Sequence, residues 1–294
     1  MRDPGGLLMS TLEETSRKLC ELSEKTYQNP YTYIDWVDSM PGNQWFMSPS
    51  LISIDGTDRF ASMDESSRQK LSFFEAINFF SLNIHGEKSL VEGLSKRLYS
   101  KELKEYAPYL HHFLDEENKH MIYFGGFCQR YAGKVYRDRK MIIPREYAAG
   151  EEDFLFFAKV MIFEELVDVY NMRMSVDESM EAISRKINLI HHLEEARHLV
   201  FGRRMVEYLF EKYANTWSTE TLASVRQYLG DYLIATWKEY YNPDVYKDAE
   251  LESPFDLMEA AWNSDRQKAH RKEVSSKVIA FLKEREMILE EPAL

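Results

Sequence analysis

The sequence predicts an all-α protein built as a bundle of long helices. Apolar residues recur at helical spacing in long runs, at about residues 66–99, 102–132, 151–175, 178–214, 217–241 and 255–289. No segment shows sustained alternation of apolar and polar residues between tight turns, so a sheet has little support outside the aromatic stretch near Trp45. A helix of about 30 residues extends roughly 45 Å, which suits antiparallel packing in a bundle.

Residues that end or start helices separate these runs. They are Gly133, Pro144, Asn242-Pro243 and Ser253-Pro254. Residues 10–27 also follow helical spacing, and the stretch after them is irregular because it contains Asn29-Pro30 and Pro41-Gly42. We therefore predict an N-terminal extension, residues 1–64, that packs on a bundle with C-terminal helices, residues 65–294, in a single structural domain.

Composition and charge exclude several classes of protein. The net charge of −12 over 294 residues disfavours binding to nucleic acid or to an anionic membrane, and favours a small-molecule partner. Cys20 and Cys128 are too few for a disulfide framework, and the first residues, MRDPGGLLMS, lack the apolar stretch of a secretion signal. The longest apolar stretch, residues 154–163, carries Lys159 and is half the length of a membrane span. We expect a cytoplasmic protein.

A weak internal repeat appears in the polar residues alone. Glu87 is followed 30 residues later by Glu117 in the segment DEENKH, and Glu164 is followed 31 residues later by Glu195 in the segment HHLEEARH. Each half of the repeat therefore reads Glu and then EExxH. Because the pattern occurs only twice and the intervening sequence does not match, it indicates two helix pairs that share a function and not a solenoid.

The spacing within each motif is that of a metal chelate on a helix. Residues three apart lie on one helix face, so Glu117 and His120 can bind one metal, and Glu195 and His198 can do the same. His191 stands four residues before Glu195 and falls within the same arc of roughly 60°. Apolar neighbours on several sides of this helix predict that these ionisable groups are buried, and buried charges need a partner or a metal.

Together these residues fill the ferritin-like plan, in which two helices each give a Glu and two others each give Glu-x-x-His, all facing inward. The fold class we predict is thus a ferritin-like helical bundle with additional flanking helices. Carboxylates and imidazoles suit iron, or manganese, and bridging glutamates can hold two such ions close together. Glu116 and Glu194, each one residue before a ligand glutamate, are placed to accept the free ring N–H of a histidine from the opposite motif.

Each single glutamate has competitors nearby. Glu165 adjoins Glu164, and only one of the two can face inward; we favour Glu164 because Asp168 lies beside it at i+4. Glu75 and Glu92 compete with Glu87, which the spacing to the EExxH motif selects.

The remaining candidates receive no place in the ligand set. His85, His111, His112, His192 and His270 read as surface or packed histidines, and the many phenylalanines read as core, some of which can line a substrate pocket. Tyr123, one turn after His120, can approach the site, but a buried tyrosine with a hydrogen-bonded hydroxyl is the more ordinary interpretation.

The third histidine gives the sequence a family resemblance. Ferritin-like oxygenases in general have two ExxH motifs, whereas the AurF-like arylamine N-oxygenases add a histidine seven residues before the last one, the position of His191 in HHLEEARH. The sequence resembles this family over roughly residues 65–210. It departs from the family at Glu194, where aspartate is commoner. The resemblance implies a set of four Glu and three His: Glu87, Glu117, His120, Glu164, His191, Glu195 and His198.

The resemblance also implies an activity. A di-iron centre of this type activates O2 and oxidises an amine to a hydroxylamine or nitro product, commonly in a natural-product pathway, with electrons from an external donor. Three alternatives stay open at this point: oxidation at carbon, metal storage or another non-catalytic metal-binding role, and a radical protein like the ribonucleotide reductase small chain. Bundles of this type often pair, so a homodimer is possible.

Overall fold

The computed structural model describes residues 4–40, 42–139 and 146–294. Helices account for nearly all regular structure in these ranges, and one isolated bridge between Trp45 and Met180 is the sole β-type pairing found there. The all-α prediction is therefore confirmed, and the aromatic stretch near Trp45 contributes no strand. Among the described helices, none has the length and apolar character that a membrane span requires.

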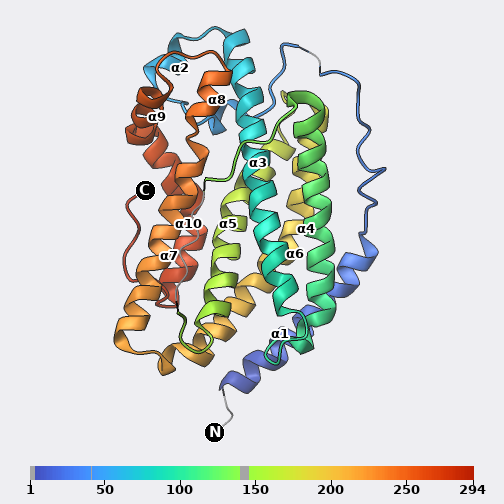
Figure 1. The fold of residues 1–294 in the computed structure, drawn as a ribbon, viewed down its shortest axis with the longest axis vertical. Coiled ribbons are helices and arrows are strands. Elements are labelled where there is room, and N and C mark those ends of the chain that lie inside the picture. The colour runs from blue at the N-terminus through green and yellow to red at the C-terminus, as the bar shows by residue number, and fades with distance from the viewer. Residues whose placement is uncertain (1–3, 41, 140–145) are drawn as a thin grey trace.

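Four long helices form the centre of the molecule (Figure 1). They are α3 (Glu65–Arg97), α4 (Ala107–Phe127), α5 (Glu151–Ser175) and α6 (Ala182–Tyr213). Helix α3 packs along α4, and α5 packs along α6. At 33 residues, α3 is about 50 Å long and reaches from one end of the bundle to the other.

Side chains fix where two of these helices begin. The Asp64 carboxylate accepts a hydrogen bond from the Ser67 amide at 2.8 Å and caps α3. The Glu181 carboxylate accepts from the Ile183 and Ser184 amides at 2.9 and 2.7 Å and caps α6. Each cap sets the helical register from which the inward-facing residues follow.

Helix α4 is shorter than the sequence predicts. The predicted run 102–132 is divided into a 3-10 turn (Lys104–Tyr106), α4 itself with Pro108 in its first turn, and a π-helical turn (Cys128–Ala132). A proline fits the first turn of a helix because its missing N–H would have no partner there. Gly133 ends the segment with a φ of 65°, which glycine adopts without a steric penalty.

The central bundle has additional helices on one side. Helices α7 (Thr219–Tyr240) and α10 (Asp265–Glu284) pack against α5, and α8 (Pro243–Asp248) packs against α3, with α9 (Pro254–Asn263) next to α8 and α10. The predicted single helix 255–289 is wrong. The chain breaks at Ser264, whose hydroxyl accepts from the Gln267 amide at 3.2 Å and starts a new helix.

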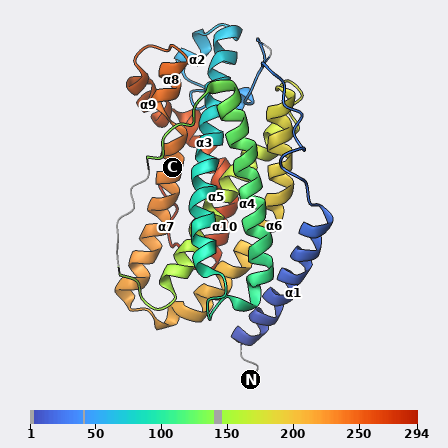
Figure 2. The same ribbon diagram turned by 45° about the vertical axis from the view of Figure 1, so that its right-hand side comes forward.

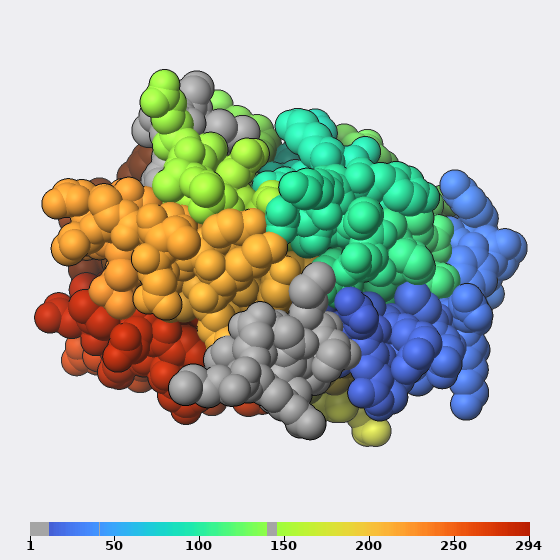
Figure 3. All heavy atoms as spheres, turned by 90° about the horizontal axis from the view of Figure 1, so that it is seen from below, coloured from blue at the N-terminus to red at the C-terminus, as the bar shows by residue number. Residues whose placement is uncertain are grey.

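The N-terminal segment covers another face. Helix α1 (Pro4–Lys25) runs diagonally across α4 and α6 (Figure 2). From below, residues 12–25 of α1 appear as blue atoms beside the teal connection between α3 and α4 (Figure 3). The short α2 (Asp58–Ser62) precedes α3, which begins at Glu65. The division of the chain after residue 64 stays a prediction.

Two glycines let α3 approach α5 closely. A Cβ atom at Gly86 would lie 2.5 Å from the Phe163 ring, and one at Gly93 would lie 2.0 Å from the Phe156 ring. Contacts this short do not occur, so any larger residue at either position would require the phenylalanine ring to move. Because Gly86 and Phe163 each adjoin one of the single glutamates of the repeat, the close approach brings these two glutamates to one level of the bundle.

Candidate metal centre

The four central helices bring all seven predicted ligand residues into one buried cluster. Helices α3 and α5 each contribute one glutamate, α4 contributes Glu117 and His120, and α6 contributes three residues. None of the seven is more than 1% exposed: Glu87, Glu117, His120, Glu164, His191, Glu195 and His198. This is the arrangement of Glu and Glu-x-x-His helices that the sequence predicts.

One half of the cluster contains two imidazoles. Donor atoms of Glu87, His120, His191 and Glu195 all lie within 4.8 Å of one another. The His191 Nε2 atom lies 3.2 Å from an oxygen of Glu87 and 3.1 Å from one of Glu195. The His120 Nδ1 atom lies 3.3 Å from the same Glu195 oxygen. Four donors from three helices thus surround a volume suited to one metal ion.

The other half contains one imidazole and more carboxylates. Donor atoms of Glu117, Glu195 and His198 lie within 4.8 Å of one another, and so do carboxylate oxygens of Glu87, Glu117, Glu164 and Glu195. The His198 Nδ1 atom lies 2.9 Å from a Glu117 oxygen and 3.1 Å from a Glu195 oxygen. Glu195 offers a donor atom to both halves, so its carboxylate would be within reach of either ion.

Three glutamates of the cluster have buried oxygen atoms without hydrogen-bond partners. They are both carboxylate oxygens of Glu164, one oxygen of Glu87 and one of Glu117. A buried carboxylate without a partner costs several kcal/mol unless it is neutralised. Hard oxygen donors and imidazoles are ligands of iron and manganese. The residues present therefore fit a metal centre.

A second layer of carboxylates lies behind the two ExxH histidines. The His120 Nε2 atom lies 2.9 Å from a Glu194 oxygen, and the His198 Nε2 atom lies 2.8 Å from a Glu116 oxygen. The prediction that Glu194 and Glu116 each accept from the ExxH histidine of the opposite motif is confirmed. Each of these two carboxylates is also paired with a buried cation.

Lys119 and Arg197 are those cations, and sequence reasoning missed both. The Lys119 ammonium donates to Glu194 at 2.7 Å, and the Arg197 guanidinium donates to Glu116 at 2.6 Å. The signal was present in the repeat, since EENKH and EEARH both place a cation directly before the histidine. The charge of each outer carboxylate is therefore balanced by that of its cation.

The charges of the inner cluster are balanced only in part without a metal. Four inner carboxylates can carry four negative charges, which two divalent cations would neutralise. Without metal ions, protons on the histidines and on a carboxylate offset part of this negative charge. Burial lowers the pKa of His120, but hydrogen bonds to Glu117 and Glu194 raise it to about 9. Burial and the charges of Glu195 and Glu117 raise the pKa of Glu164 well above its ordinary range.

The competing glutamates lie elsewhere. Glu165 points away from the cluster and pairs with Arg203. Glu92 is exposed and pairs with Lys96 at 2.7 Å. Glu75 is buried beside a separate small cavity. Asp168, which the sequence argument placed beside Glu164, instead binds the His192 ring at 2.5 Å.

The histidines left out of the ligand set all have other partners. His85 binds the Tyr136 carbonyl, His111 binds the Tyr99 hydroxyl, His112 lies near Glu24, His192 binds Asp168, and His270 binds the Tyr170 hydroxyl. Tyr123 is buried with its ring 5.9 Å from that of Tyr33, but its hydroxyl has no hydrogen-bond partner among the described residues, so the expectation of a hydrogen-bonded hydroxyl is wrong.

Aromatic rings close the cluster on the α4 side. The Phe113 ring stacks on the His198 ring with centroids 4.0 Å apart, and the Phe124 ring meets the edge of His191 at 4.9 Å. Both phenylalanines are buried. The rings exclude water and fix the planes of the two imidazoles.

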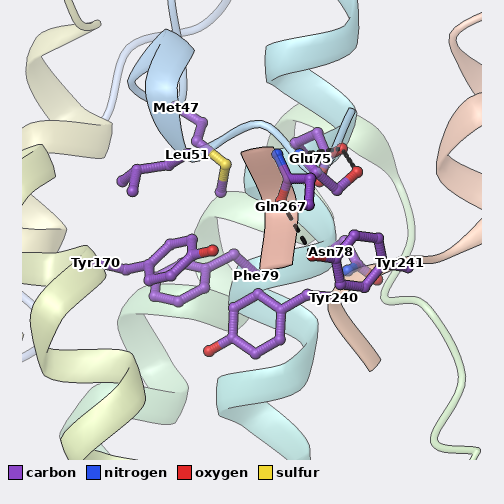
Figure 4. Close-up of a pocket in the computed structure, with 10 residues that line it drawn as sticks. Met47, Leu51, Glu75, Asn78, Phe79, Tyr170, Tyr240, Tyr241 and Gln267 are labelled. Atoms are coloured by element: carbon purple, nitrogen blue, oxygen red, sulfur yellow. Dashed lines mark hydrogen bonds between the residues drawn. The ribbon is translucent and has the colours of Figure 1, made fainter. Parts of the chain in front are cut away.

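A second buried polar region lies between α3, α7 and α10 (Figure 4). Glu75, Asn78 and Gln267 face a small cavity there, beside a group of stacked aromatic rings. One Glu75 oxygen accepts from the Ser53 amide at 3.2 Å and from the Ser53 hydroxyl. Burial raises the pKa of Glu75 to about 7. Within the described part of the chain, Glu75 is the one carboxylate that lines this cavity and no imidazole does, so it does not resemble the metal cluster.

Comparison with known proteins places this site in a family. The model of the family described as P-aminobenzoate N-oxygenase AurF matches residues 10–286. The chain belongs to the AurF family. Membership confirms the resemblance carried by His191, and the chain is accordingly a di-iron oxidase with a buried Glu/His site that fits a metal centre.

Two solved structures are similar to the AurF-family chain. One is an R2-like ligand-binding oxidase from Sulfolobus acidocaldarius, with a TM-score of 0.43 and 15% identity over 95% of this chain and 92% of that one. The other is an R2-like ligand-binding oxidase without metal cofactor, with a TM-score of 0.44 and 15% identity over 88% of this chain and 96% of that one. No curated protein matches the chain at a significant level.

Proposed function

We propose that this AurF-family chain is an O2-dependent non-haem di-iron N-oxygenase that oxidises an amino group of a small molecule to a hydroxylamine or nitro group. The observation that carries the proposal is the third imidazole: the His191 Nε2 atom faces the oxygens of Glu87 and Glu195 inside the cluster. The family match over residues 10–286 supports the same activity. A place in a natural-product pathway rests on the family alone.

The proposed ligands form two overlapping groups. Glu87, His120 and His191, which have donor atoms in one group, would hold one ion. His198 would hold the other, and we assign Glu164 to this second ion because it is the remaining carboxylate of the cluster. Carboxylate oxygens of Glu117 and Glu195 lie near both groups and would be shared between the ions.

The charge balance supports two divalent ions. Four inner carboxylates match two doubly charged cations, whereas the outer carboxylates Glu116 and Glu194 are already balanced by Arg197 and Lys119. A site that binds a single divalent ion would leave two buried negative charges to be neutralised by protons.

The protein itself supplies orientation and a dry environment. Glu116 and Glu194 hold the Nε2–H groups of His198 and His120, so the Nδ1 lone pairs of these rings face the centre of the cluster. The stacked Phe113 ring restricts the plane of His198. When bound, two ferrous ions supply electrons for the reduction of O2 and open positions at which it can react.

The overall reaction requires an external reductant. One oxygen atom of O2 enters the new N–O bond. The other oxygen atom is reduced to water, and this reduction consumes two electrons and two protons in each turnover. We propose that an external electron donor supplies these electrons. Continued oxidation of the same nitrogen would give the nitro product.

The experiment uses iron-loaded protein, a chemical reductant, ¹⁸O2 and a panel of arylamines. The proposal predicts a product in which ¹⁸O is bound to nitrogen, formed by wild-type protein and by Glu165→Gln but not by Glu164→Gln. Glu165 is the matched control, since it adjoins Glu164 and pairs with Arg203 outside the cluster.

Other products would overturn the assignment. Label found on carbon, or loss of hydrogen from carbon, would indicate oxidation of a different bond. Iron uptake far above two ions per chain, without any oxidised product, would indicate storage.

A further inference from the structure

The three imidazoles of the cluster enter it in two different orientations. His120 and His198 present Nδ1 to the centre and direct Nε2 to the outer carboxylates. His191 is reversed. Its Nε2 atom lies 3.2 Å from Glu87 and 3.1 Å from Glu195, and its Nδ1 atom faces the side chain of Asn171.

Asn171 is a fully buried residue of α5. It follows Glu164 by seven residues, which is about two helical turns, so both side chains lie on the same face of the helix. Its Nδ2 atom contacts the His191 Nδ1 atom, and its Oδ1 atom is buried without a hydrogen-bond partner. Among the residues that the structure describes, no charged group takes the place beside His191 that Glu116 and Glu194 take beside the other two histidines.

Metal binding dictates which His191 nitrogen carries the proton. A neutral imidazole has one N–H and one lone pair, and a metal at Nε2 requires the lone pair there. Nδ1 must then carry the hydrogen. The Nδ2–H group of Asn171 would then face the Nδ1–H group of His191, and two donors that face each other repel.

Turning over the amide removes the conflict. The two ends of an asparagine amide have nearly the same shape, so Oδ1 can take the place of Nδ2 without displacing its neighbours. The Oδ1 atom, now without a partner, then accepts from His191 Nδ1–H. The Nδ2 group takes the unpartnered place, so the exchange sacrifices no hydrogen bond.

We infer that Asn171 is a positioning residue whose Oδ1 atom accepts the Nδ1–H of His191 in the metal-loaded protein and so directs Nε2 to the metal. The inference rests on the proposed ligation by His191. A neutral amide withdraws the ring proton less than a carboxylate does, so His191 is the weakest electron donor of the three imidazoles. In this chain the third imidazole therefore differs in its hydrogen-bond partner from the two histidines of the ExxH motifs.

The test is NMR of ¹⁵N-histidine-labelled protein loaded with zinc, a diamagnetic probe that takes imidazole ligands. The expected spectrum shows two imidazoles bound through Nδ1 and one bound through Nε2 with a slowly exchanging Nδ1–H. The latter signal is assigned to His191 by its absence from His191→Gln.

Three variants separate the hydrogen bond from general packing. Asn171→Leu, close in size but without an acceptor, is expected to lose the slow Nδ1–H exchange and to weaken binding of one of the two zinc ions about 10- to 100-fold. Asn171→Asp keeps an acceptor and is expected to retain both the slow Nδ1–H exchange and the wild-type zinc affinity. Asn188→Leu is the control, because Asn188 is buried on α6 near His191 but donates to the Ser184 carbonyl.

Two outcomes would overturn the inference. One is a His191 signal with the proton on Nε2. The other is an Asn171→Leu protein with the same Nδ1–H exchange and zinc affinity as wild type. If Asn171→Leu fails to fold, the wild-type spectrum and Asn171→Asp still decide between the two tautomers.

The test also separates this inference from the proposed function. Zinc binding with the expected tautomer, in a protein that oxidises no amine, would refute only the function. Amine oxidation by a protein whose His191 shows the opposite tautomer would refute only the role of Asn171.

Discussion

Replacing Glu75 with Gln should change how stability depends on pH. Glu75 lies on α3, away from the metal cluster, and is 4% exposed. Its carboxyl group accepts hydrogen bonds from the Ser53 amide and hydroxyl, but burial outweighs them and raises its pKa from an ordinary 4.5 to about 7. Folding therefore favours the protonated, neutral form.

The sign and size of the effect follow from this difference. An acid whose folded pKa is raised contributes stability that is fully present below its unfolded pKa and is lost as pH rises through the folded pKa. The window is therefore about pH 4.5 to 7. A pKa difference of this size corresponds to about 3 kcal/mol in the free energy of unfolding. Glutamine keeps an oxygen for Ser53 and has no charge to bury.

The assay is urea unfolding of metal-free protein at pH 5 and pH 8. Glu75→Gln should match wild type within about 1 kcal/mol at pH 5 and exceed it by up to about 3 kcal/mol at pH 8. Glu92→Gln, at an exposed site on the same helix, is the control and should track wild type at both pH values. Equal pH dependence in wild type and Glu75→Gln would refute the argument.

Three further predictions concern the bundle and its charges. Lys119→Met should destabilise the protein by about 3–5 kcal/mol in urea unfolding, because it leaves Glu194 buried without its cation, whereas Lys96→Met at the surface should cost under about 1 kcal/mol. Gly93→Ala should cost about 1–3 kcal/mol, since its Cβ would meet the Phe156 ring at 2.0 Å, and unchanged stability would show that the helices separate freely. Loading two divalent ions at pH 7 should release protons, measurable by calorimetry in two buffers, and no release would contradict the proton-balanced cluster.

The inner cluster was predictable because its signal is local and repeated. Helical spacing places Glu117 with His120 and Glu195 with His198 regardless of how the helices pack. The choice of Glu164 over Glu165 depended on which helix face turns inward. Glu164 lies in the cluster as predicted, although Asp168, one turn later, binds His192 and not the cluster.

The residues around the cluster were harder to predict. Lys119 and Arg197 repeat at the same position of both motifs, but a cation on a helix is usually solvated, and these two are buried by the packing of α1, α4 and α6. Asn171 belongs to no motif. Its role depends on the reversed orientation of His191, which is a property of the packing between α5 and α6 and has no local sequence signal.

The predicted helix boundaries were wrong where a capping residue lies inside an apolar run. Ser264 with Gln267 three residues later has the form of a capping box and starts α10, yet the apolar spacing continues across it. Pro108 likewise marks the first turn of α4 within the longer predicted run. Local capping energy of about 1 kcal/mol is sufficient to decide such a break when both parts pack well.

The most direct test of the metal centre is Mössbauer spectroscopy of anaerobically ⁵⁷Fe-loaded protein before and after exposure to O2, comparing wild type with His191→Ala. We predict two coupled irons per chain in wild type that react with O2, and an altered or partly lost iron signal in His191→Ala. A single mononuclear iron, or iron whose spectrum does not change in His191→Ala, would contradict the proposed seven-residue centre.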